Sequence, residues 1–323
     1  MATRTFQNYI TNGRLNNKLV ILEDVYQSTS LSELSAESFG ILRLDCSKFL
    51  EIDLMNSINL PSGREDSYGW AQGSCIDNNK KYIYLAIAGY DSKDSFPFGS
   101  RILKINYSTK EIENYVDNLN IYGSNSLTYN ENNFLKIIKK KANQSGIYPS
   151  VETYGNFPVL VIPSINSAGT YLKTIHYFTN SLIEFVEISN LSFNPKFITY
   201  DNINERYALS SDTTIFILDK NLNSTKNFQF LSPYKIQDAT CNKDFIFIAS
   251  NKIIDEYGLK CENIIDVIDW DGKHISRFFV PIVENKHFSP KLESLFSTND
   301  KLFGVFSNWE KATIYEFSLW LRS

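Results

Sequence analysis

Pairs of short apolar runs, joined by turns rich in Asn and Asp, recur along the whole chain. Asn and Asp tolerate turn geometry, so each pair predicts a β-hairpin. Six pairs follow this pattern: Phe6–Thr11 with Lys18–Leu22, Ser74–Ile76 with Tyr82–Ile87, Ser126–Tyr129 with Phe134–Ile138, Phe197–Tyr200 with Tyr207–Ser210, Ala239–Cys241 with Phe245–Ala249, and Leu295–Ser297 with Leu302–Phe306.

A second predicted hairpin follows most of these pairs. Its strands are Ile41–Leu44 with Phe49–Leu54, Arg101–Tyr107 with Ile112–Val116, Tyr171–Tyr177 with Leu182–Val186, Thr213–Leu218 with Thr225–Phe230, and Ile264–Ile268 with His274–Val280. The last unit has only a third strand, Thr313–Leu319. Four antiparallel strands, repeated with weak identity every 40 to 70 residues or roughly so, are typical of a β-propeller.

We therefore predict an all-β fold, a single β-propeller domain over residues 1–323 with four-stranded antiparallel blades. The six units predict six blades, or five if the first unit donates strands to the last. A β-sandwich is the main alternative. It explains the strand content but does not require the same four-strand pattern to recur.

Composition excludes several classes of function. The net charge is −4 and the sequence pI is about 5.6, which argue against binding driven by charge to nucleic acid or to an anionic membrane. No apolar run reaches membrane-spanning length, and the first residues lack the apolar segment of a signal peptide. The four cysteines form no CxxC pair and the three histidines have no neighbouring ligands, so we expect no metal, no other cofactor and no disulfide framework.

The long connections of a propeller are the natural places for binding residues. With strands a to d counted from the channel outward, the long b–c and d–a connections of this chain share one face. They are rich in aromatic residues, of which we select Tyr68, Trp70, Tyr90, Tyr148 and Tyr154, with Trp309 in the shorter b–c connection of the last unit.

The segment from Arg64 to Ser74 combines charges, aromatic rings and an amide in one d–a connection. Aromatic rings stack on the apolar faces of sugars, so we assign Trp70 and Tyr68 to stacking. Arg64, Glu65 and Gln72 are assigned to directed hydrogen bonds. Packing of Trp70 between adjacent blades is the alternative interpretation.

Catalytic patterns are weak. A glycosidase needs two facing carboxylates, and the sequence does not pair Glu65, Asp66, Asp91 or Asp94. Cys75 and Cys241 occupy the same place in two repeats, which favours packing on a crowded innermost strand over nucleophilic catalysis. The stretch Asp269–Lys273 predicts a tight turn rather than a calcium loop.

The segments Gly69–Asp77, Tyr82–Ala86 and Arg101–Ile105 together resemble a blade of phage and prophage receptor-binding (tail-associated) β-propellers, and are also similar to helveticin-like bacteriocin propellers. The resemblance covers about 40 residues clearly and the other blades by pattern only. It implies a virion or secreted protein that recognises a glycan of the bacterial cell envelope, such as a wall teichoic acid.

We therefore expect a non-enzymatic receptor-binding module whose partner is a bacterial surface glycan and whose further partners are other virion or tail proteins. It would be made in the cytoplasm and act in a phage tail or outside the cell. An envelope-polysaccharide hydrolase or lyase is one alternative. A structural virion or scaffold protein with no small ligand is the other.

Overall fold

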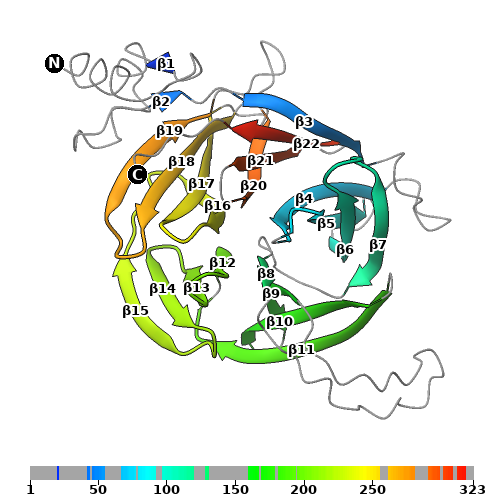
Figure 1. Ribbon diagram of the computed structural model, residues 1–323, viewed down its shortest axis with the longest axis horizontal. Coiled ribbons are helices and arrows are strands. Elements are labelled where there is room, and N and C mark those ends of the chain that lie inside the picture. Colours follow the sequence, from blue (N-terminus) through cyan, green and yellow to red (C-terminus); the bar gives the residue numbers. More distant parts are fainter. Residues whose placement is uncertain are drawn as a thin grey trace.

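The computed structural model describes residues 20–21, 42–43, 46–54, 67–77, 79–91, 97–119, 128–130, 159–166, 169–178, 181–193, 195–254, 261–280, 290–298, 301–307 and 311–317. These residues form five sheets arranged in a ring (Figure 1). Four of the sheets have four antiparallel strands, and the fifth has four antiparallel strands with two short strands added at its outer edge. The prediction of an all-β propeller with four-stranded blades is confirmed.

We number the blades I to V in chain order. Blade I comprises β4 (Ser67–Ile76), β5 (Tyr82–Asp91), β6 (Pro97–Asn106) and β7 (Ile112–Leu119). Blade II comprises β8 (Thr128–Asn130), β9 (Val159–Asn166), β10 (Gly169–Phe178) and β11 (Ser181–Leu191). Blade III comprises β12 (Phe197–Asp201), β13 (Arg206–Ser210), β14 (Thr214–Asp219) and β15 (Ser224–Gln229).

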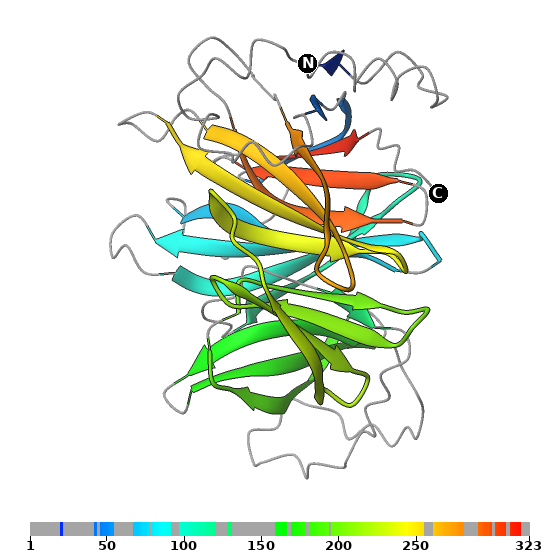
Figure 2. The same cartoon turned by 90° about the vertical axis from the view of Figure 1, so that its left-hand side faces the viewer.

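Blade IV comprises β16 (Lys235–Cys241), β17 (Phe245–Ile253), β18 (Cys261–Asp269) and β19 (His274–Phe279). Blade V comprises β20 (Lys291–Ser297), β21 (Leu302–Ser307), β22 (Lys311–Phe317) and, from far earlier in the chain, β3 (Cys46–Asp53). The first strand of each blade is innermost, and each innermost strand contacts the next until β20 contacts β4. Figure 2 shows the strands running across the thickness of the ring.

The described residues form five sheets, which matches the alternative count of five blades. The first predicted unit does not form a blade in the part of the chain that the structure describes, because its strands join two other sheets. β3 pairs antiparallel with β22, with Ile52 opposite Ala312, and supplies the strand that the last unit lacks. β2 (Leu42–Arg43) pairs in parallel with β19, and β1 (Val20–Ile21) pairs with β2. The remainder of the predicted hairpin from Phe6 to Leu22 lies outside the described residues.

Blade II differs from the sequence prediction in the identity of its second strand. The sequence predicts Phe134–Ile138 as the partner of the innermost strand, and that run lies outside the described residues. The observed partner is β9, with Asn130 opposite Val159. Strand β9 falls within the stretch that we interpreted as a long b–c loop. The long connection of blade II therefore joins strands a and b, whereas its b–c connection spans only the interval from Asn166 to Gly169.

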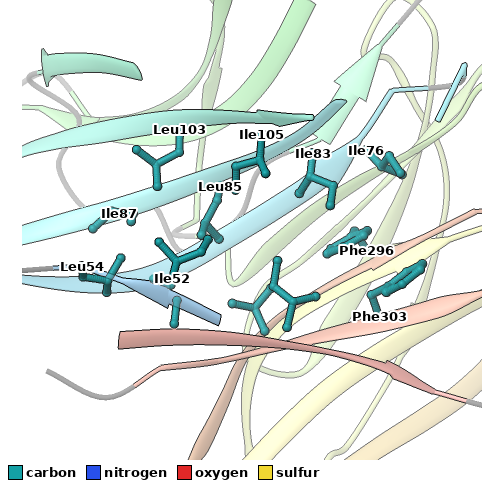
Figure 3. Close-up of a cluster of buried hydrophobic side chains, with 14 residues drawn as sticks. Ile52, Leu54, Ile76, Ile83, Leu85, Ile87, Leu103, Ile105, Phe296 and Phe303 are labelled. Carbon is teal, nitrogen blue, oxygen red and sulfur yellow. The ribbon is translucent and has the colours of Figure 1, made fainter. Parts of the chain in front are cut away.

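Apolar side chains fill the spaces between blades III and IV, IV and V, and V and I. Figure 3 shows the cluster between blades V and I, in which Ile83 and Leu85 of β5 pack with Phe303 of β21 and Ile52 of β3. Residues between them on β5, such as Tyr84, are also buried because the other face of the sheet is covered. Burial of both faces explains why the inner strands read as continuous apolar runs rather than as alternating patterns.

Buried asparagines connect blade IV to the backbone of blade V. Asn251 Nδ2 donates to the carbonyl of Leu292 at 3.1 Å. Asn263 Nδ2 donates to the carbonyl of Pro290 at 2.9 Å, and its Oδ1 accepts from the amide of Leu292, also at 2.9 Å. A buried polar group costs free energy unless it is paired, so these bonds fix how the two blades face each other.

The turn at Asp269–Lys273 is a tight hairpin turn, as predicted. Asp269 Oδ1 accepts from the amides of Asp271 at 2.9 Å and Lys273 at 2.8 Å. Gly272 has φ of 89°. A side chain there would be strained in this left-handed region and would meet the ring of Phe228.

Lysine and aromatic residues join blade I to the closing strand. The ammonium of Lys110, in the turn after β6, lies 3.1 Å from the ring centroid of Phe49 on β3 and 4.6 Å from that of Tyr107. Partial burial lowers the pKa of Lys110. The contact is a cation–π interaction that ties the outer edges of blades I and V together.

Because β3 completes blade V, we predict that truncating its one deeply buried isoleucine strongly lowers stability. Ile52→Ala should lower the free energy of unfolding by about 2 to 5 kcal/mol, because it removes methyl groups from the cluster between blades V and I and leaves a cavity. Denaturation in urea measures the change. Ser47→Ala, at an exposed position of the same strand, is the control and should stay within about 0.5 kcal/mol of wild type. An equally small effect of Ile52→Ala would contradict closure of the ring by β3.

Candidate functional site

The innermost strands end in residues whose side chains organise the following a–b turn. Asp77 Oδ1 accepts from the amides of Lys81 at 2.6 Å and Tyr82 at 3.1 Å. Asp201 Oδ1 accepts from Ile203 at 3.0 Å and Asn204 at 3.2 Å. Asn242 and Thr298 occupy the equivalent places in blades IV and V and accept in the same way. This shared geometry explains the recurrence of Asp, Asn and Thr after the first strand of each unit.

A cavity of about 230 Å³ lies at this end of the channel, which we call the a–b end. All five blades contribute to its wall through the last residues of their innermost strands. The wall comprises Cys75, Ile76, Asp77 and Lys80 of blade I, Thr128 of blade II, Thr199, Tyr200, Asp201, Asn202 and Ile203 of blade III, Thr240, Cys241, Asn242 and Lys243 of blade IV, and Phe296, Ser297 and Thr298 of blade V.

Three hydroxyl groups of the wall form a directed set. Thr199 Oγ1 donates to Cys241 Sγ at 3.1 Å, and Ser297 Oγ donates to the carbonyl of Cys241 at 2.9 Å. Thr240 and Ser297 share a hydrogen bond of 3.0 Å. Because the one hydroxyl proton of Ser297 goes to Cys241, Thr240 is the donor in that bond. The protons of all three hydroxyls are thus used inside the wall, whereas their oxygens keep acceptor capacity.

The two thiols of the cavity are held in the protonated form. Burial raises the pKa of Cys241 from its ordinary value of 9.0 to about 12, and the charge of Asp201 adds to this effect. Burial raises the pKa of Cys75 well above 9.0, with further contributions from Asp238 and Asp77. A thiolate, not a thiol, is the nucleophile and metal ligand, so these cysteines line the cavity as small packed residues. This agrees with their interpretation from the sequence.

The carboxylates of the cavity are also engaged. Asp77 organises its own turn. Asp201 Oδ2 accepts from Arg206 Nε at 3.0 Å and from Asn204 Nδ2 at 2.7 Å, and Arg206 lies over the ring of Trp270, 3.9 Å from its centroid. With Lys80 and Lys243 beside them, the wall carries both signs of charge and selects for neither a cation nor an anion.

Buried polar residues lie below the cavity. Ser74 of blade I, Ser294 of blade V and Asp238 of blade IV form a hydrogen-bonded chain there, in which Ser74 and Ser294 are 2.6 Å apart and Ser294 donates to Asp238. Asp238 and Ser294 are 0% exposed, and Ser74 is 2% exposed. Water therefore does not reach these residues, and the described walls close the inner end of the cavity.

The aromatic residues predicted for binding lie toward the opposite end of the channel, in so far as they are described. Tyr68 and Trp70 belong to β4, and Tyr90 belongs to β5, so they stand in strands where the sequence predicts loops. Tyr68 pairs directly with Tyr90, and Trp70 pairs with Ala88. Their side chains are outside the described part of the structure, and their binding role stays a prediction.

Gln72 is the one predicted contact residue with a described side chain. It is half-buried and lies at a β-bulge, where the register of β4 against β5 shifts between Ala71 and Gly73. Equivalent shifts occur in β16 at Gln237 and in β20 at Glu293. A bulge adds one residue to a strand and changes the direction of the neighbouring side chains. Gln72 therefore lies at a backbone irregularity that recurs in other blades.

The other predicted contact residues, Arg64, Glu65, Tyr148, Tyr154 and Trp309, lie outside the described residues. For Tyr148 and Tyr154, the topology removes the reason for placing them on the same face as Trp70. Both belong to the connection between the end of β8 at Asn130 and the start of β9 at Val159. These two strand ends pair with each other at the a–b end. Of the carboxylates weighed for hydrolysis, Asp91 ends β5, while Glu65, Asp66 and Asp94 also lie outside the described residues.

Sequence reasoning missed the hydroxyl groups of the cavity. Thr199, Thr240 and Ser297 sit one or two residues before the turn-forming Asp201, Asn242 and Thr298, and that recurring spacing is a signal in the sequence. Among the described residues, no group of three or more His, Cys, Asp and Glu side chains is placed to hold a metal ion. Within those same ranges, no helix has the length and apolar character needed to cross a bilayer.

Solved structures of two other proteins are similar to this chain at low sequence identity. Raptor of Chaetomium thermophilum matches over 90% of this chain at 10% identity with a TM-score of 0.40, and this chain spans 31% of the Raptor chain. A luciferin-regenerating enzyme matches over 84% of this chain and 95% of its own, at 9% identity and a TM-score of 0.41. No family model and no curated protein matches the sequence. Neither similar structure informs on the ligand of this chain.

The raised pKa of Cys241 predicts a loss of stability in alkali. Between the unfolded value near 9.0 and the folded value of about 12, the unfolded chain releases the thiol proton while the folded chain keeps it. The free energy of unfolding is therefore unaffected by this group below pH 9.0 and falls as the pH rises toward 12.

Urea denaturation over this range of pH tests the prediction. Cys241→Ala should show a shallower loss of stability than wild type, because it has no thiol to ionise. Thr199→Val removes the hydrogen bond to Cys241 Sγ but keeps the thiol, so it should retain the steeper loss. Identical slopes for wild type and Cys241→Ala would contradict a thiol held protonated by the fold.

Proposed function

We propose that this protein is a non-enzymatic binding module that recognises a saccharide of the bacterial cell envelope. The observation that carries the proposal is the polar cavity at the a–b end, which has contributions from all five blades. Concave sites with a few fixed polar groups are the usual places for small ligands in a rigid scaffold. A blade similar to those of phage receptor-binding propellers supports the choice of an envelope glycan and of attachment through other virion or tail proteins.

The chemistry of the cavity favours binding over catalysis. A nucleophilic cysteine needs a lowered pKa, whereas burial raises the pKa of both Cys75 and Cys241. A glycosidase needs one carboxylate poised as acid and one as base or nucleophile. Asp77 and Asp201 instead hold the turns that build the wall.

The hydrogen-bonding capacity of the wall suits a ligand that carries hydroxyl groups. Thr199, Thr240 and Ser297 offer acceptor oxygens, so the ligand must donate. The free edges of the innermost strands add backbone donors and acceptors, because each of these strands is paired on one side only within its sheet. Sugars both donate and accept through each hydroxyl and therefore match such a wall.

An exposed isoleucine at the mouth adds the apolar contact that a sugar ring requires. Ile203 lines the cavity and is 61% exposed. The C–H faces of a pyranose ring bind to apolar side chains, while its rim of hydroxyls binds polar groups. Ile203 beside three acceptor hydroxyls provides both kinds of contact in one place.

Binding to isolated wall polysaccharides from a panel of bacteria tests the proposal. We expect saturable binding that soluble sugars compete. Ile203→Ser should weaken it about tenfold, since an exposed isoleucine buried by the ligand contributes on the order of 1.5 kcal/mol. Ile253→Ser is the matched control, because Ile253 is also exposed, at 54%, but lies at the end of β17 and does not line the cavity.

The same assay separates the alternatives. Release of soluble fragments from the polysaccharide would identify a hydrolase or lyase in place of a binder. Absence of binding to every wall preparation, together with a stoichiometric complex with virion proteins, would identify a structural component. Equal affinities of wild type, Ile203→Ser and Ile253→Ser would show that the glycan does not bind in the cavity.

Trp70→Ala distinguishes the two ends of the channel. With the cavity as the site, this variant binds polysaccharide as wild type does and Ile203→Ser binds weakly. The reverse result would place the glycan at the opposite end, where Tyr68 and Trp70 begin β4. Loss of the folded state in Trp70→Ala, followed by circular dichroism, would show instead that the indole packs between blades, and the Ile203 pair then decides the site alone.

A further inference from the structure

We infer that the cavity takes the terminal unit of a glycan chain and not an internal unit. The inference rests on the proposed function and specifies how the ligand enters. It follows from the buried inner end of the cavity, from the ring of strand ends around it and from its size.

The inner end of the cavity is closed on each innermost strand whose side chains are described. The exposed fraction of the side chains falls to 0% within a few residues of those that line the cavity. This occurs at Ile198 on β12, at Asp238 on β16 and at Leu295 on β20. The hydrogen-bonded chain of Ser74, Ser294 and Asp238 joins three of the five blades at that level. A glycan chain therefore does not pass through the channel.

Among the described residues, the side walls show no lateral exit for a polymer. A chain bound through an internal unit needs a groove with two open ends, so that the units on either side can leave. Here the wall is a ring of strand ends, with Cys75, Thr128, Thr199, Thr240 and Ser297 contributed by blades I to V in turn. Each innermost strand contacts the next around this ring. The units beyond the bound one must leave through the mouth, which carries the exposed residues Lys80, Ile203 and Lys243.

The volume allows one small unit. Pockets for drug-sized ligands measure about 300 to 1,000 Å³, and this cavity has about 230 Å³. Its capacity is that of about seven or eight water molecules at roughly 30 Å³ each. A cavity of this size suits one sugar ring or polyol unit better than two linked rings.

Chain-end recognition makes a prediction that does not require the identity of the glycan. The probe is a wall polysaccharide that the protein binds, compared with the same material after partial acid hydrolysis and size fractionation. Hydrolysis that shortens the chains about fourfold gives about four times as many chain ends per milligram and leaves the number of internal units unchanged. If chain ends are bound, mass action predicts that the fragments inhibit binding about four times better, compared at equal mass.

Inhibition that stays constant or falls with hydrolysis would overturn the inference, because recognition would then be of internal units. That result leaves the proposed function intact, since the intact polysaccharide still binds. No binding of the polysaccharide before hydrolysis would overturn the proposed function and the inference with it. Ile203→Ser should lower inhibition by intact chains and by fragments to the same degree, while Ile253→Ser should change neither; unequal loss would contradict a shared terminal site.

Discussion

Packing of apolar side chains between neighbouring blades, wherever those side chains are described, is the constraint on which this structure depends. A single four-stranded blade cannot cover its own apolar faces, so each blade becomes stable only when it is packed between two others. The clusters between blades III and IV, IV and V, and V and I are continuous from one sheet to the next. The ring must therefore close, and the pairing of β3 with β22 completes the last sheet.

Closure also creates the candidate site. Five innermost strands end at the same level, and the side chains that form their a–b turns stand around the axis. Asp77 and Asp201 are needed for these turns, so their carboxylates are not available for chemistry. The thiols of Cys75 and Cys241 are needed as small packed residues and stay protonated. What remains open to a ligand is a set of acceptor oxygens and strand edges, and the proposed binding of a sugar rests on these groups.

The sequence predicted the architecture well because the fold is encoded locally. Short apolar runs, turns of Asn and Asp, and the four-strand period all follow from neighbouring residues. The assignment of β3 required knowledge of a partner far along the chain, and it was available only as an alternative. The prediction of Phe134–Ile138 as the second strand of blade II failed because the observed strand, Val159–Asn166, is also an apolar run and only packing selects between the two. The cavity was missed because Thr199, Thr240 and Ser297 lie far apart in sequence and meet only when the ring closes.

Strand β3 also sets the timing of folding during synthesis. Glu51 of β3 and its partner Lys311 of β22 are separated by 260 residues. At the usual rate of about 5 to 20 residues per second, the ribosome needs roughly 13 to 50 seconds to make the intervening chain. Throughout that interval β3 is made but has no partner strand, and the apolar face of blade I that will meet blade V is uncovered. A protein with this topology benefits from chaperones that shield such surfaces, and its yield on expression should depend on the rate of translation more than that of a fold whose strands pair in order.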